Sequence, residues 1–184
     1  MKRKALLGLS LASTLLLNGV AHSELPPVPI EVQEYKYKGV KFTPTEQYVL
    51  DFFQERGITD RSALATILGN IKAESMFHPN ICEGGARVRY ENCHRGGFGL
   101  IQWTTTNRYK GLGLFANKYG GNPSELHTQL RYLVNESQWL NIEYKMKTPG
   151  MTIAYYMDAA YYWLGWGIHG NRTHYAHDYY HRLA

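Results

Sequence analysis

The sequence lacks the residue patterns of several common enzyme classes. Serine, histidine and aspartate do not occur in an order that includes a nucleophile elbow, which argues against serine-hydrolase chemistry. Cysteine is scarce, with only Cys82 and Cys93, and a thiol-dependent peptidase is excluded if these two are bridged. Amidase and peptidase functions are therefore poorly supported.

Long apolar runs and strong charge of one sign are also missing from the part of the chain that follows the first 23 residues. No segment there is apolar enough to be predicted as a membrane span. Of the 20 lysines and arginines, three lie within the first four positions, and the rest nearly balance the 15 aspartates and glutamates. So weak a positive excess does not favour nucleic acid as a partner.

The first residues have the pattern of a secretory signal peptide. Lys2, Arg3 and Lys4 precede a stretch from residue 5 to 21 that is almost uncharged, and small residues lie just before position 24. We therefore expect residues 1–23 to be cleaved and the rest to be exported to the periplasm or outside the cell, without stable membrane association. A retained membrane anchor is the alternative, although this stretch contains polar residues and is short for a span of about 20 residues.

The remaining chain is long enough for one domain with a hydrophobic core. Residues 24–41 are rich in proline and have no helical periodicity, which predicts a linker that leads into a single domain over residues 42–184. Residues 80–99 contain both cysteines and several glycines, and predict a loop with a small hairpin. Apolar spacing and capping residues elsewhere predict helices over 43–57, 60–79, 108–119, 123–137, 151–164 and 171–182.

Cys82 and Cys93 are predicted to form a disulfide, because an exported chain reaches an oxidising compartment. A metal site with His94 as a third ligand is the alternative, but the spacing and the number of ligands do not fit a zinc pattern. Three further histidines, at helical spacing near the end of the chain, are interpreted as a solvated or glycan-facing stripe rather than a metal site. They are His174, His177 and His181. No cofactor is implied.

Glu74 is the strongest candidate for a catalytic group. It follows Ile67 by seven residues and Ile71 by three, so it shares their apolar face on a helix. Partial desolvation of a carboxyl raises its pKa and keeps the proton available for donation, which is what a general acid in glycoside cleavage requires. The alternative is a structural carboxylate at a helix end, paired with Lys72 or with an arginine.

Two short motifs on either side of the cysteine-bearing loop resemble those of a known enzyme group. Gly69-Asn70-Ile71 precedes Glu74-Ser75, and Gly99-Leu100-Ile101-Gln102-Trp103 follows the loop. This combination resembles the lysozyme-like superfamily, including goose-type lysozymes and lytic transglycosylases, and is most similar to the phage tail lysozyme family. The supporting residues of the resemblance are Asn80, Arg108, Gln129, Leu130, Tyr132 and Leu133.

The resemblance implies a mainly α (α+β) lysozyme-like fold with a small disulfide-bearing β-hairpin region. It also implies a monomeric muramidase that cleaves the β-1,4 bond between N-acetylmuramic acid and N-acetylglucosamine of peptidoglycan, with Glu74 as the general acid. A phage or prophage origin fits the same resemblance. Trp103 could equally be an ordinary core tryptophan. The residues expected to bind the glycan strand are Ser75, Gly99, Leu100, Gln102 and Trp103.

The identity of a second catalytic group decides between mechanisms, and the sequence leaves it open. Glu83 and Glu91 lie in the cysteine-bounded loop, and Thr104 could orient a water molecule, although each could instead be an ordinary solvated residue. No aspartate lies between Glu74 and Gln102, so a lytic transglycosylase that uses one glutamate as acid and then base remains an alternative. A chitin-cleaving enzyme and a non-catalytic glycan-binding module of the same fold are further alternatives.

Overall fold

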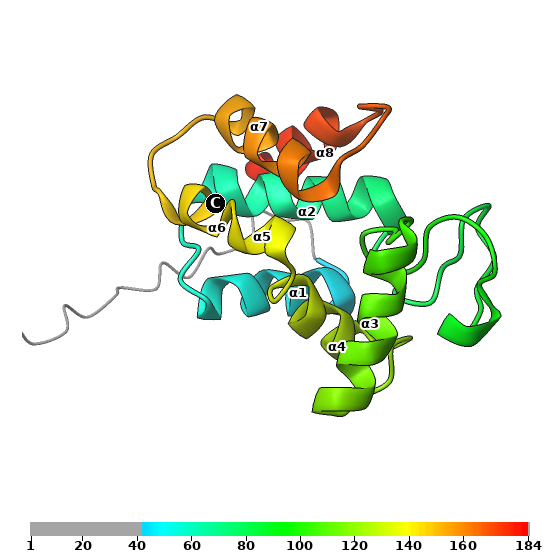
Figure 1. Cartoon of the computed structure of the whole chain (residues 1–184). Coiled ribbons are helices and arrows are strands. Elements are labelled where there is room, and N and C mark those ends of the chain that lie inside the picture. Colours follow the sequence, from blue (N-terminus) through cyan, green and yellow to red (C-terminus); the bar gives the residue numbers. More distant parts are fainter. Residues whose placement is uncertain (1–41, 184) are drawn as a thin grey trace, which may run out of the picture.

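The computed structural model describes residues 42–183, which form a helical domain (Figure 1). The signal peptide and the linker predicted for residues 1–41 lie outside the described residues. The mainly helical fold class predicted from the sequence is confirmed. The helices of the described part are α1 Pro44–Glu55, α2 Arg61–Ser75, η1 Tyr90–Asn92, α3 Thr106–Tyr119, α4 Leu126–Leu133, α5 Ser137–Leu140, α6 Glu143–Lys147, α7 Ile153–Leu164 and α8 Arg172–Arg182.

The first two helices begin where their capping residues predict. The Thr43 hydroxyl accepts a hydrogen bond from the Glu46 amide at 3.2 Å, and the Glu46 carboxylate accepts one from the Thr43 amide at 2.7 Å. This capping box starts α1. The Asp60 carboxylate accepts hydrogen bonds from the amides of Ser62 and Ala63 and starts α2 in the same way.

The region predicted as one helix over residues 123–137 is shorter and interrupted. The Asn122 side chain accepts a hydrogen bond from the Ser124 amide at 2.9 Å, and this local turn delays the start of α4 to Leu126. At the other end, the amides of Asn135 and Glu136 bond to carbonyls three residues back, which tightens and ends the helix. The short helices α5 and α6 that follow are absent from the sequence-based prediction.

The hairpin predicted between residues 80 and 99 is not confirmed. In the described residues this region has isolated β-bridges rather than a ladder, and they join Ile81 to Arg87, Cys82 to Phe98, and Phe98 to Trp103. The predicted disulfide between Cys82 and Cys93 is present, with the two Cα atoms 5.6 Å apart. The loop is thus held by a covalent link and scattered hydrogen bonds.

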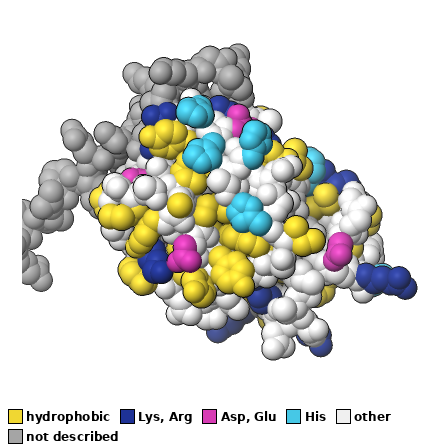
Figure 2. Space-filling model, turned by 90° about the horizontal axis from the view of Figure 1, so that it is seen from above, with side chains coloured by type: hydrophobic (Ala, Val, Ile, Leu, Met, Phe, Trp, Pro, Cys, Tyr) yellow, Lys and Arg dark blue, Asp and Glu magenta, His cyan; other side chains and the backbone are white. Residues whose placement is uncertain are grey.

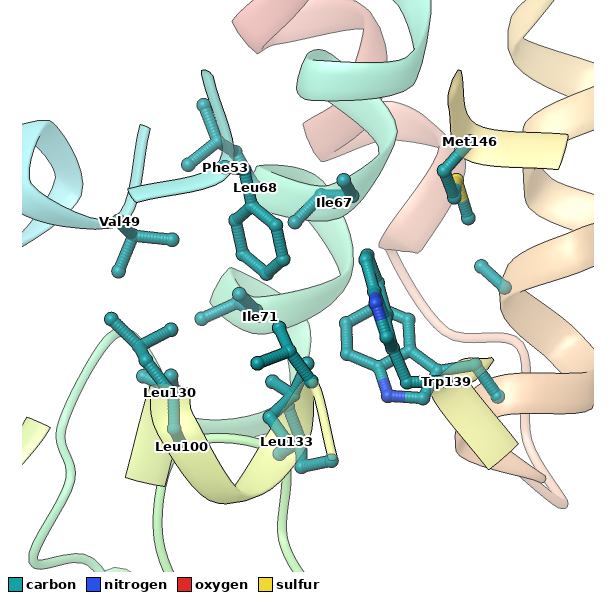
Figure 3. Close-up of a cluster of buried hydrophobic side chains, with 14 of the residues drawn as sticks. Val49, Phe53, Ile67, Leu68, Ile71, Leu100, Leu130, Leu133, Trp139 and Met146 are labelled. Carbon is teal, nitrogen blue, oxygen red and sulfur yellow. The ribbon is translucent and has the colours of Figure 1, made fainter. Parts of the chain in front are cut away.

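Helix α2 is the centre of the hydrophobic core. Figure 1 shows it between α1 on one side and α7 and α8 on the other. Every residue from Ala63 to Ile71 is buried, so this helix is covered on all sides. Figure 3 shows how side chains from five other segments surround it: Val49, Phe53, Leu100, Leu130, Leu133, Trp139 and Met146.

Helices α2 and α8 contact each other backbone to backbone at Gly69. A Cβ atom on Gly69 would lie 2.5 Å from the Ala176 amide nitrogen and 2.7 Å from the Ala176 Cα atom. The two helices run antiparallel, because Arg61 bonds to the Tyr180 carbonyl at one end and Glu74 bonds to Arg172 at the other. This packing brings the start of α8 to the end of α2. In residues 42–183, no helix is both long and apolar enough to cross a membrane.

We predict that Gly69→Ala lowers the free energy of unfolding by about 2 kcal/mol, because overpacking costs roughly 1–3 kcal/mol while the better helix propensity of alanine returns at most about 1 kcal/mol. The clash is with backbone atoms, which cannot rotate away. Chemical denaturation of both proteins measures the difference. Gly167→Ala is the control, because a Cβ there has no neighbour within 4 Å. Equal stability of the two variants would contradict the prediction.

Candidate active site

A cleft of about 740 Å³ opens at the end of α2. Four segments form it: the last turn of α2 with Glu74, the cysteine-bearing loop with Glu83, the turn that carries Gln102, and the loop between α7 and α8. The lining residues are Glu74, Glu83, Gly97, Ile101, Gln102, Thr104, Thr105, Leu164, Gly165, Trp166, Gly167, Ile168, Gly170 and Arg172.

Glu74 lies in this cleft with only 14% of its side chain exposed. Its Oε1 atom accepts a hydrogen bond from the Arg172 guanidinium, and the two groups form an ion pair. Burial raises the pKa of the Glu74 carboxyl, while Arg172 and, more weakly, Arg108 act to lower it, and the net pKa lies above the ordinary value. Glu74 therefore combines the desolvation expected of a general acid with the arginine pairing that was the alternative, structural interpretation.

Arg172 is a site residue that the sequence analysis missed. It is 98 residues away from Glu74 in the chain, and only the packing of α8 on α2 brings the two together. The residue is 8% exposed, and its Nη1 atom also donates hydrogen bonds to the carbonyls of Ile168 and His169, both at 2.9 Å. The sequence predicts a helix over 171–182, but no local pattern indicates that Arg172 at its start pairs with Glu74.

Ser75 connects the end of α2 to the neighbouring turn. The side chain is 2% exposed, and its hydroxyl oxygen lies 2.7 Å from the Leu100 carbonyl oxygen and 3.2 Å from that of Ile71. Ser75 is not among the residues that line the cleft. Its hydroxyl holds the Gly99–Gln102 turn against the helix that carries Glu74.

Gln129 of α4 holds the same turn from its other side. The Leu100 amide donates to the Gln129 side-chain oxygen at 2.8 Å, and the Gln129 amide group donates to the carbonyls of Pro79 and Pro123. Gly99 has a φ of +76°, and a Cβ on it would lie 2.7 Å from the Gln129 amide. A larger residue at position 99 would therefore separate these groups. Leu100 itself is fully buried in the core.

Three of the residues predicted from the sequence line the cleft together with Glu74: Glu83, Gln102 and Thr104. The Gln102 amide group donates to the Gly99 carbonyl at 3.0 Å, and the Thr104 hydroxyl donates to the Gln102 carbonyl at 2.8 Å. Glu83 is exposed, and its carboxylate accepts a hydrogen bond from the Gly97 amide at 3.0 Å. A second carboxylate therefore shares the cleft with Glu74.

Trp103 and Glu91 lie outside the cleft lining, as do the predicted residues Ser75, Gly99 and Leu100. Trp103 is fully buried, and its indole nitrogen donates to the Glu136 carboxylate at 2.9 Å. Glu136 in turn pairs with Arg108 at 2.9 Å, so Trp103 belongs to a buried polar network behind the cleft. Glu91 is exposed on η1.

The cleft has apolar residues that the sequence analysis did not select. Trp166 and Ile168 both line it, and Ile168 is 81% exposed. They lie in a segment with glycines at positions 165, 167 and 170, which lacks the helical or alternating pattern by which apolar residues are recognised in a sequence. Their position beside Glu74 follows from where α7 ends and α8 begins.

The histidine stripe of α8 is exposed, in agreement with the interpretation as a solvated face. His174, His177 and His181 all lie at the surface. Figure 2, which views the molecule from the side of α7 and α8, shows histidine side chains grouped among hydrophobic ones. Across residues 42–183 there is no group of three or more histidine, cysteine, aspartate or glutamate side chains that could hold a metal ion.

Comparison with known proteins adds two findings. Residues 44–183 match the model of the phage tail lysozyme family. Morphogenesis protein 1 of Bacillus phage B103 is 30% identical over 110 residues, which is 55% of this chain and 27% of that protein. The chain thus spans little more than a quarter of the length of this curated relative.

We predict that Gln129→Met destabilises the domain by about 3 kcal/mol, because it leaves the Leu100 amide and two carbonyls without partners, at a cost of roughly 1–3 kcal/mol per buried group. Chemical denaturation measures the loss, and faster hydrogen exchange of the Leu100 amide locates it. Gln138→Met is the control, because it removes only an exposed hydrogen bond from the Ser137 hydroxyl. Its free energy of unfolding should differ from that of the wild type by less than about 0.5 kcal/mol. A similar small change in Gln129→Met would refute the anchoring role.

Proposed function

Because this chain belongs to the phage tail lysozyme family, we propose that it degrades peptidoglycan by cleaving the β-1,4 bond between N-acetylmuramic acid and N-acetylglucosamine. The family membership supports a lytic role on the bacterial cell wall. The disulfide supports an extracellular or periplasmic location, since such bonds persist in oxidising compartments.

Glu74 is proposed as the general acid, and its burial in an open cleft is the observation that carries this assignment. A glycosidic oxygen must be protonated as its bond breaks, so the acid must hold a proton near the working pH and reach the substrate. Glu74 meets both requirements, because burial raises its pKa and it lines a cleft of about 740 Å³.

Glu83 is proposed as the second carboxylate, because it is the one of the two loop glutamates that lines the cleft. In an inverting hydrolase it would act as a base on water, with Thr104 as an orienting group. An acid must hold its proton and a base must be ionised, so the two carboxyls need different environments. Glu74 is largely buried, whereas Glu83 is exposed. A transglycosylase would not need Glu83.

The glycan strand is proposed to lie between the Gln102 turn and the loop that joins α7 to α8. Gln102 can hydrogen-bond sugar hydroxyl or acetamido groups, and Gly97 and Gly165 let a polysaccharide approach the backbone closely. Trp166 and Ile168 offer apolar contact to the faces of sugar rings. The sequence analysis expected Trp103 to contact the glycan. Trp103 is buried, and Trp166 takes this place in the proposal.

We predict that Glu74→Gln lowers the release of muropeptides from bacterial sacculi by roughly 10²–10⁴-fold, because it removes the proton donor. Mass spectrometry of soluble products measures the rate and also the chemistry: reducing ends indicate a hydrolase, and anhydro ends indicate a transglycosylase. Glu55→Gln, at an exposed position on α1, is the control for the loss of one carboxylate.

Glu83→Gln separates the two mechanisms further, since a loss comparable to that of Glu74→Gln supports the hydrolase. Equal release by wild type and Glu74→Gln would overturn the assignment of Glu74. Binding of sacculi without any release by wild type would favour a non-catalytic glycan-binding module.

The rate should fall as the pH rises through the pKa of Glu74, because only the protonated carboxyl donates. Since burial raises this pKa, the fall should come at a higher pH than for an ordinary glutamate. Carbon NMR titration of the Glu74 carboxyl, together with kcat measured against pH, tests this directly. A Glu74 midpoint at or below the ordinary value for a glutamate would contradict the prediction.

A further inference from the structure

Arg172 contacts two different parts of the cleft through one side chain: Glu74 at the end of α2 and the Gly165–Gly170 segment. Its Nη2 atom bonds to Oε1 of Glu74. Its Nη1 atom donates to the Ile168 and His169 carbonyls at 2.9 Å each, and its guanidinium carbon lies 4.9 Å from the centre of the Trp166 ring. An arginine this deeply buried is uncommon unless it is paired, and here the pairing extends over both walls of the cleft.

The segment from Gly165 to Gly170 packs against the hydrophobic core at Trp166, whereas its glycines and Ile168 have little packing. Gly165 and Gly170 have φ values of +66° and +56°, and a Cβ on Gly165 or Gly167 would have no neighbour within 4 Å. Ile168, in its middle, is 81% exposed. The two Arg172 hydrogen bonds and the packing of Trp166 therefore attach this segment to the body of the domain.

We propose that Arg172 is a positioning residue that couples the carboxylate of Glu74 to the placement of the Gly165–Gly170 segment on the cleft wall. This inference rests on the proposed function. The segment contributes Trp166 and Ile168 to the wall, so a glycan strand that presses on it also acts on Arg172. Because Arg172 holds Oε1 of Glu74, a shift of the segment changes the orientation of the acid toward the scissile bond.

Arginine suits this role better than lysine would. Its planar guanidinium has donors on separate nitrogens, so it can bond to a carboxylate and two carbonyls at once while one face contacts an aromatic ring. A lysine at this position would keep the positive charge beside Glu74 but could not maintain all of these contacts. Arg172→Lys therefore separates the effect of the charge from the effect of the coupling.

The charged and titratable groups around Glu74 predict in which direction its pKa changes when Arg172 is replaced. Arg172 and Arg108 lower the pKa of Glu74, burial raises it, and Glu83 shares the cleft. Replacement of Arg172 by methionine should raise the pKa of Glu74 further, because a hydrogen bond and a nearby positive charge are lost.

NMR titration of the full chain tests the coupling without relying on activity. In wild type, the amide signals of residues 167–170 should shift with the same pH midpoint as the Glu74 carboxyl. That midpoint should vanish from these amide signals in Glu74→Gln and in Arg172→Met. Amide signals that are insensitive to the Glu74 midpoint in wild type would overturn the proposal.

Kinetics on sacculi or soluble glycan fragments provide the second readout. Arg172→Lys should lower kcat by roughly 10- to 100-fold, the size of effect expected when a catalytic group is misplaced by about 1 Å, and should also raise KM. Unchanged kcat and KM in a folded Arg172→Lys protein would contradict the coupling. If wild type released no glycan, the proposed function would fail, while the NMR titration would still decide on the coupling.

Discussion

The contact of α2 with α8 at Gly69 is the constraint on which the site depends. Because Gly69 has no side chain, the Ala176 backbone can lie directly against α2, and the two helices can pack closely enough for their ends to meet. Glu74 at the end of one and Arg172 at the start of the other then share a cleft. A methyl group at position 69 would push the two helices apart and so disturb the pairing of Glu74 with Arg172, more than one helical turn away.

Glu74 is held between two opposing effects. Burial favours the neutral carboxyl, and Arg172 favours the charged one, with burial the larger. A carboxyl that only needed to be neutral would not require a buried arginine beside it. A carboxylate that only served as a structural partner would not need to face an open cleft of about 740 Å³. The combination fits a group whose orientation and protonation both matter.

Much of the second motif holds the cleft wall in place and does not contact substrate. Ser75 and Gln129 fix the turn through the Leu100 backbone, and Trp103 anchors it to the buried Glu136 carboxylate, which pairs with the partly buried Arg108. Ile101 and Gln102 are the parts of the motif that line the cleft. A short motif of this kind therefore combines residues at the surface of the site with others that position them.

The sequence by itself determined the helical fold class, the capped starts of α1 and α2, the disulfide, and Glu74 as a desolvated carboxyl, because caps, periodicity and helical faces depend on residues close in the chain. It could not decide that Trp103 is buried, that Glu83 and not Glu91 reaches the cleft, or that Arg172 pairs with Glu74. These features depend on contacts between residues as far as 98 positions apart, which only the packing of α8 on α2 and the folding of the loops bring together.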